Sequence, residues 1–119
     1  MKIAITSEGK DLSSMVDPRF GRAKGFILYD ADNSKFDYFD NGQNLQSSKG
    51  AVIHAAKNVI NAGAIAIITG NVGPKAHSAL SSVGFEIYIN AQESVQETID
   101  SYRKGLLKKA FEANVEGHW

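Results

Sequence analysis

The sequence of 119 residues contains no cysteine. This absence excludes disulfide bonds, a thiolate nucleophile and every zinc or iron–sulfur site that cysteine holds. An excess of charge of either sign is also missing, because 13 basic side chains balance 13 acidic ones. A protein that binds nucleic acid by electrostatic attraction usually carries a basic excess, so we expect no nucleic-acid partner.

Long apolar runs are absent as well. No stretch approaches the roughly 20 apolar residues of a membrane-spanning helix. The first residues, Met1 to Thr6, have the pattern of a strand rather than that of a signal peptide. We therefore expect a cytoplasmic protein without a membrane partner. Hydrophobic residues make up 43% of the chain, a usual value for a globular protein. Length and composition predict a single domain over residues 1–119, with a weakly ordered tail at 106–119.

Apolar segments and turn signals alternate in a way that predicts an α/β domain. We expect strands at 2–6, 64–68 and 85–89, and a β-hairpin formed by 25–30 and 35–40. We expect helices at 47–61, at 74–82 and from Ser94, where Ser94 and Glu97 fit a capping box. Val83 and Leu106 should belong to the apolar stripes of the last two helices. Because helices that alternate with strands connect parallel pairs, the expected fold is a three-layer domain around a five-stranded mixed sheet.

The segment Ile67-Ile68-Thr69-Gly70-Asn71-Val72-Gly73-Pro74 leads from a strand into a helix. Proline suits the first helical position, where its missing N–H would have had no partner. Backbone N–H groups and the positive end of the helix dipole then point at one spot outside the sheet, which favours an anion. The alternative is an ordinary turn in which the glycines only relieve strain. The segment matches neither a P-loop nor the GxGxxG fingerprint.

A second motif, Asp17-Pro18-Arg19-Phe20-Gly21-Arg22, places two arginines beside a turn. Their planar guanidinium groups could clamp an oxyanion. Alternatively, Arg19 and Arg22 form surface salt bridges with Asp11, Asp17 or Asp30, which are common and contribute little.

Imidazole is the only soft nitrogen donor in this chain, so His77 and His54 are the candidate metal ligands. His77 lies one turn into the helix that Pro74 opens and could reach a ligand at the glycine turn. The alternative for His54 is a solvated helix face. The carboxylates Glu8, Asp11 and Asp17 share one loop, but a hydrolase needs carboxylates that converge. We therefore predict a binding protein and not an enzyme.

Together these pieces resemble the dinitrogenase iron–molybdenum cofactor biosynthesis family, whose small members are similar to nitrogenase-cofactor carrier proteins. The resemblance spans nearly the whole chain. It is carried by Met1-Lys2-Ile3-Ala4-Ile5, Val16-Asp17-Pro18-Arg19-Phe20-Gly21-Arg22-Ala23, Ile68-Thr69-Gly70-Asn71-Val72-Gly73-Pro74, Ala79-Leu80 and the closing Asn114-Val115-Glu116-Gly117-His118-Trp119.

This resemblance implies a ribonuclease-H-like α/β/α fold with strand order 3-2-1-4-5 and strand 2 antiparallel. It also implies non-catalytic binding of an anionic metal–sulfur cluster or its precursor. The family's conserved pieces map to Arg19, Gly21, Arg22, Gly70, Asn71 and Gly73. Nucleases of this fold place a metal-binding aspartate on the first strand, where this chain has only Ile3, Ala4 and Ile5 in the middle positions.

The sequence thus predicts a small carrier or scaffold for an iron–molybdenum cofactor or a related cluster, which it exchanges with cluster donor or acceptor proteins. Without a thiolate ligand, the cluster would be held reversibly. The alternative is a binding module for a phosphate-bearing metabolite that uses the same glycine turn and arginines.

Overall fold

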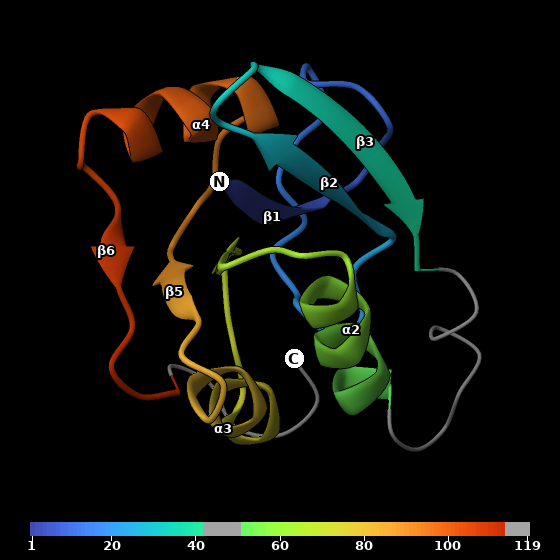
Figure 1. Cartoon of the computed structure of the whole chain (residues 1–119), viewed down its shortest axis with the longest axis vertical. Helices are drawn as coiled ribbons and strands as arrows, with labels where there is room; N and C mark the ends of the chain where they lie inside the picture. The colour runs from blue at the N-terminus through green and yellow to red at the C-terminus, as the bar shows by residue number, and fades with distance from the viewer. Residues whose placement is uncertain (42–50, 114–119) are drawn as a thin grey trace.

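The computed structural model describes residues 1–41 and 51–113 and shows them arranged around one mixed β-sheet (Figure 1). Within these residues the sheet has six strands in the order β3-β2-β1-β4-β5-β6. Their bounds are β1 Lys2–Ser7, β2 Gly25–Asp30, β3 Lys35–Asp40, β4 Ala66–Ile68, β5 Glu86–Ile89 and β6 Lys108–Lys109.

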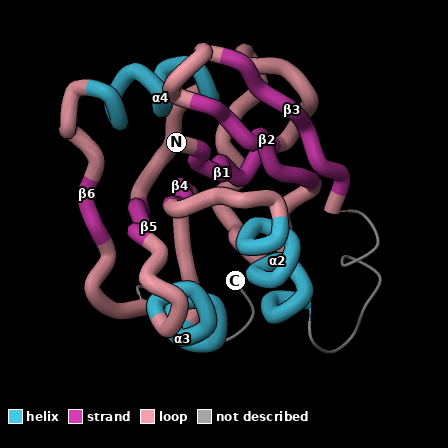
Figure 2. The backbone as a smooth tube through the Cα atoms, viewed as in Figure 1, coloured by secondary structure: helices cyan, strands magenta, loops and turns pink. Residues whose placement is uncertain are grey.

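Helices cover both faces of this sheet. Helices α2 (Ala51–Asn61) and α3 (Pro74–Ser81) lie together on one side, and α4 (Val95–Arg103) lies on the other (Figures 1 and 2). Ala56 and Leu80 pack with one half of the core, and Ile99 packs with the other half. The domain therefore has three layers, as expected from the sequence. Of the helices described, none is long and apolar enough to cross a membrane.

The strand directions bring several loops to the same edge of the sheet. Strand β1 pairs in parallel with β4, and β4 pairs in parallel with β5. Strand β2 runs antiparallel to both β1 and β3, which confirms the predicted hairpin and the predicted antiparallel strand. The carboxyl ends of β1, β4 and β5 consequently share one edge, which we call the carboxyl edge. Open α/β sheets usually bind ligands there.

The expectation of five strands was wrong by one. Strand β6 extends the sheet beyond β5, with Tyr88 opposite Lys109 and Ile89 opposite Lys108. Its two lysines have no strand-like alternation of apolar residues, so the local sequence does not predict a strand. Pairing with β5 creates it. Of the predicted helix at 47–61, residues 47–50 lie outside the described part of the chain.

Two apolar residues expected to face the core are exposed. Helix α3 ends at Ser81 and α4 ends at Arg103, so Val83 and Leu106 lie beyond the helical period that would have turned them inward. These two residues are 56% and 71% exposed. Gly84 and Gly105 follow the helix ends with φ of 82° and 71°, a conformation that glycine adopts without steric cost.

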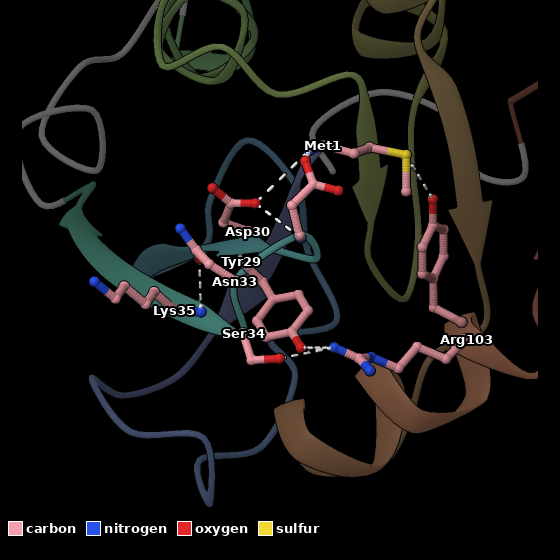
Figure 3. Close-up of polar contacts among 9 residues, drawn as sticks. Met1, Tyr29, Asp30, Asn33, Ser34, Lys35 and Arg103 are labelled. Carbon is pink, nitrogen blue, oxygen red and sulfur yellow. Dashed lines mark hydrogen bonds and ion pairs between the residues drawn. The ribbon is translucent and has the colours of Figure 1, made fainter.

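The edge opposite the carboxyl edge is held by charged contacts (Figure 3). The guanidinium of Arg103 donates hydrogen bonds to the Tyr29 hydroxyl and, at 3.2 Å, to Ser34 Oγ in the hairpin turn. The amino group of Met1 pairs with the carboxylates of Asp30 and Asp32. These contacts fasten the end of α4 and the start of β1 to the hairpin, so they have a structural role.

The capping box at the start of α4 is confirmed. Ser94 Oγ accepts a hydrogen bond from the Glu97 N–H at 3.2 Å, and Glu97 Oε1 accepts one from the Ser94 N–H at 3.2 Å. These two bonds satisfy donors that the helix itself leaves unpaired.

We predict that Ser94→Ala lowers the free energy of unfolding by about 1 kcal/mol, because it removes the acceptor for the Glu97 N–H. Urea denaturation measures the change. Ser13→Ala, at an exposed serine in the 8–15 loop, is the matched control and should leave stability unchanged. Equal effects of the two substitutions would contradict the role of the cap.

Candidate functional site

Two segments that are far apart in the sequence meet at the carboxyl edge. We call residues 17–24 the arginine loop and residues 69–73 the glycine loop. Arg19 and Asn71 form a parallel β-bridge, and Asn71 Nδ2 donates a hydrogen bond to the Pro18 carbonyl oxygen at 3.0 Å. The two motifs that carry the predicted site residues therefore meet at the carboxyl edge.

Gly70 allows this close approach. A Cβ atom at this position would lie 2.8 Å from Pro18 Cα and 2.9 Å from the Pro18 carbonyl oxygen, both of which are backbone atoms. The absence of a side chain at Gly70 is therefore a steric requirement of the contact between the two loops. The alternative that the glycines only relieve strain in an ordinary turn does not account for Gly70.

The glycine loop leads directly into α3. Gly73 occupies the N-cap with φ of −85° and has no side chain to cap the helix, and Pro74 begins the first turn. That turn contains no acidic residue, and it carries an exposed lysine, Lys75. A positive charge is unfavourable beside the positive end of a helix dipole unless an anion compensates it. The geometry at this helix end therefore favours an anion.

Lys75 was not among the residues predicted for the site. The signal was present in the sequence, since lysine follows proline where acidic residues are usual. Lys75 becomes a candidate for the site only because the structure places it at the uncapped N-terminus of α3, next to the loop that contacts the arginine loop.

The two arginines differ in their contacts. Arg19 is 48% exposed in its side chain, and its Nε lies 3.8 Å from Asp17 Oδ1. Arg19 thus forms a long salt bridge with Asp17, which is one of the partners that the salt-bridge alternative named. Arg22 is partly buried, and within residues 1–41 and 51–113 it takes part in no ion pair. Both guanidinium groups belong to a loop that lies beside the glycine loop.

A buried amide supports the arginine loop from beneath. Asn41 follows β3, and its Nδ2 donates hydrogen bonds to the Ala23 carbonyl oxygen at 2.8 Å and to the Gly21 carbonyl oxygen at 3.3 Å. The sequence predicts Gly21 as a site residue but not Asn41. Asn41 belongs to no recognisable sequence motif. It reaches the arginine loop only because strand β3 of the hairpin ends next to this loop.

The three carboxylates of the first long loop do not form a catalytic group. Asp17 is buried, and its two oxygens accept hydrogen bonds from the backbone N–H groups of Arg19 and Lys24. Glu8 and Asp11 are exposed. In the part of the chain that the structure describes, no three His, Asp or Glu side chains gather in a way that could hold a metal ion.

His77 is directed toward the last strand. Its Nε2 lies 3.1 Å from the Ala110 carbonyl oxygen, and its Nδ1 lies 3.2 Å from Ser81 Oγ. Because a carbonyl only accepts, Nε2 donates to Ala110, and in the neutral ring Nδ1 then accepts from the serine hydroxyl. A metal bond to this ring would have to replace one of these contacts. His54 is exposed on α2, and His118 lies outside the described residues.

A second contact nearby links β6, the last strand of the sheet, to its neighbour β5. Lys109 Nζ pairs with Glu86 Oε2 at 2.8 Å, and this hydrogen bond raises the pKa of Lys109 above its usual value. The contacts of His77 and Lys109 together hold β6 against α3 and β5.

We predict that Gly70→Ala separates the two loops and lowers the free energy of unfolding by about 1–3 kcal/mol through overpacking. Gly84→Ala is the matched control. It introduces the same methyl group at a position with nothing within 4 Å and a φ of 82°, so it should cost about 1 kcal/mol through backbone strain alone. Only Gly70→Ala should shift the amide resonances of Arg19 and Asn71. Unshifted resonances in a folded Gly70→Ala protein would contradict the steric role of this glycine.

We predict that His77→Ala accelerates hydrogen exchange of the Ala110 amide, whose N–H donates to the Ile87 carbonyl oxygen. The expected loss of stability is about 1 kcal/mol, the usual contribution of one hydrogen bond. His54→Ala, at an exposed position, should change neither quantity. Unchanged exchange combined with loss of bound metal would place the His77 ring in the binding site instead.

Known proteins share the fold of this chain. The model of a family described as dinitrogenase iron-molybdenum cofactor matches residues 1–105. The chain is 38% identical to the orange protein from Desulfovibrio gigas, solved in its apo form, with a TM-score of 0.93 and 96% of each chain covered. It is 34% identical to a putative NifB protein from Thermotoga, with a TM-score of 0.84 and 98% of each chain covered. An uncharacterized protein from Methanocaldococcus jannaschii is 31% identical over 111 residues, which cover 92% of this chain and 91% of that one.

Proposed function

Because the chain belongs to the dinitrogenase iron–molybdenum cofactor family, we propose that it binds and carries an anionic metal–sulfur cluster, or a precursor of one, without catalysing a reaction. The cargo would be received from and passed to cluster donor or acceptor proteins in the cytoplasm. The sheet order also supports the ribonuclease-H-like class that the sequence resemblance implied. The relative from Desulfovibrio gigas is described as an apo form, which is consistent with a ligand-bound counterpart for that protein.

The observation that carries this proposal is the contact between the arginine loop and the glycine loop. It brings the loop that carries Arg19 and Arg22 to the edge of the sheet where Lys75 and the N-terminus of α3, which no side chain caps, also lie. Guanidinium groups donate paired hydrogen bonds to anions with several acceptor atoms. The helix end adds partial positive charge. All of these groups attract negative charge.

The donor set also predicts how tightly the cargo is held. The chain has no cysteine, so no cysteine thiolate can bind the metals of the cluster. Hydrogen bonds and charge attraction would hold the outer atoms of the cluster, and these contacts can be broken on delivery. Any direct bond to a metal would come from His54 or His77. The exposed ring of His54 is the easier of the two to recruit, because both nitrogens of His77 already have partners.

We predict that the purified protein, incubated without oxygen with ferrous iron, molybdate and sulfide, acquires a visible absorption band that stays with it through gel filtration. Changing both Arg19 and Arg22 to alanine should weaken this binding by more than tenfold, because charged hydrogen bonds contribute on the order of 1.5–3 kcal/mol each. Lys35→Ala is the control, since it removes a positive charge from the start of β3, at the edge opposite the site.

The phosphate alternative gives a different result in the same experiment. A phosphate-binding module should acquire no absorption band, and titration with inorganic phosphate should shift the amide resonances of residues 70–73 and of Lys75. Unchanged cluster binding in the double arginine variant would remove both arginines from the site.

A further inference from the structure

The hydroxyl of Thr6 lies at the junction between the two loops. Thr6 is fully buried near the end of β1, and its Oγ1 donates a hydrogen bond to the Asp17 carbonyl oxygen at 2.7 Å. The same oxygen lies 3.0 Å from Thr69 Oγ1, the first residue of the glycine loop, which is also fully buried. Since Thr6 has a single hydroxyl hydrogen, Thr69 is the donor in that second bond. One side chain therefore connects the start of each loop.

Asp17 continues this connection into the arginine loop. Its backbone N–H donates to the Thr6 carbonyl oxygen at 3.0 Å, so the residue is held by Thr6 on both sides of its backbone. Its carboxylate accepts the Arg19 N–H at 3.0 Å through Oδ1 and the Lys24 N–H at 3.2 Å through Oδ2. The two oxygens thus tie together the two ends of the segment that carries both arginines.

The burial of these groups makes the arrangement specific. Asp17 is 1% exposed, and Thr6 and Thr69 are also shielded from water. A buried polar group that loses its partner cannot recover the lost bond from solvent. The loops are therefore held in one relative position before any ligand is present. Such preorganisation removes part of the ordering cost of binding.

We propose that Thr6 and Asp17 are positioning residues of the binding site, which hold the arginine loop against the glycine loop in the geometry that an anionic ligand needs. They touch neither the ligand nor its metals and act through Arg19, Arg22 and the backbone of the glycine loop. This inference deepens the proposed function and rests on it for the identity of the ligand. The geometry of the empty loops can be tested without a ligand.

The chain offers a matched control for the loss of a buried hydroxyl. Thr98 on α4 is 1% exposed, and within the described residues its Oγ1 has no hydrogen-bond partner. Thr6→Val and Thr98→Val both replace a buried hydroxyl by a methyl group. Only the first substitution removes bonds between the two loops. A general effect of changing a buried threonine should therefore appear in both variants, and a positioning effect in Thr6→Val alone.

The first measurement is amide hydrogen exchange of the protein without ligand. We predict that Asp17→Asn accelerates exchange of at least one of the Arg19 and Lys24 amides by about tenfold or more, because asparagine has only one acceptor oxygen for these two N–H groups. The amide of Ile27 within β2 should keep its rate. Thr98→Val should leave the rates at Arg19 and Lys24 unchanged. Equal rates at these two amides in Asp17→Asn and the original protein would overturn the proposal.

The second measurement is binding of the species formed from ferrous iron, molybdate and sulfide, at a temperature where every variant is folded by circular dichroism. Thr6→Val should weaken binding by about tenfold, Thr98→Val should leave it unchanged, and Thr6→Ser, which keeps the hydroxyl, should restore it. Equal binding by Thr6→Val and Thr98→Val would overturn the proposal. Should Thr6→Val fail to fold, Asp17→Asn takes its place with the same expected loss.

The two hypotheses fail in different ways. Absence of cluster binding in the unchanged protein would overturn the proposed function, while the exchange rates of Arg19 and Lys24 would still decide whether Asp17 holds the loop. Normal cluster binding in the unchanged protein together with equal binding in Thr6→Val would leave the carrier function intact and overturn the positioning role.

Discussion

The close backbone contact between Pro18 and Gly70 is the constraint on which the candidate site depends. It brings Arg19 beside Asn71, and it requires a residue without a side chain at position 70. The parallel order of β1 and β4 makes this contact possible, because both loops leave the sheet at its carboxyl edge. A buried threonine and a buried aspartate then fasten the loops from the inside.

The proposed binding of an anion by a chain with no net charge depends on where its charged groups lie. The bridge between Arg19 and Asn71 brings the loop that carries both arginines beside the loop that leads into α3 and Lys75. At the opposite edge, the cations of Met1 and Arg103 are engaged in contacts with the hairpin. Binding of an anion depends on the local field at the site and not on the overall balance of charge.

The departures from the sequence predictions have a common physical cause. Strand β6 consists of two lysines and exists because β5 offers an edge to pair with. Asn41 supports the arginine loop only because the hairpin ends beneath it. His77 has the spacing of a residue that faces a ligand at the glycine loop. However, the chain returns to α3 near Ala110, and the Ala110 carbonyl oxygen forms a hydrogen bond with the His77 ring. Each of these features depends on a segment that is distant in the sequence.

The sequence by itself determined what depends on neighbouring residues: the hairpin, the proline start of α3, the capping box of α4, and the absence of thiolate chemistry. It also pointed to the two motifs of the candidate site. Only the tertiary structure decided that these motifs touch, that Gly70 is required for the contact, and that Thr6 lies between them. Short-range preferences specify helices, turns and strands. The distances between their side chains follow from strand order and register, which are set by packing of the whole sheet.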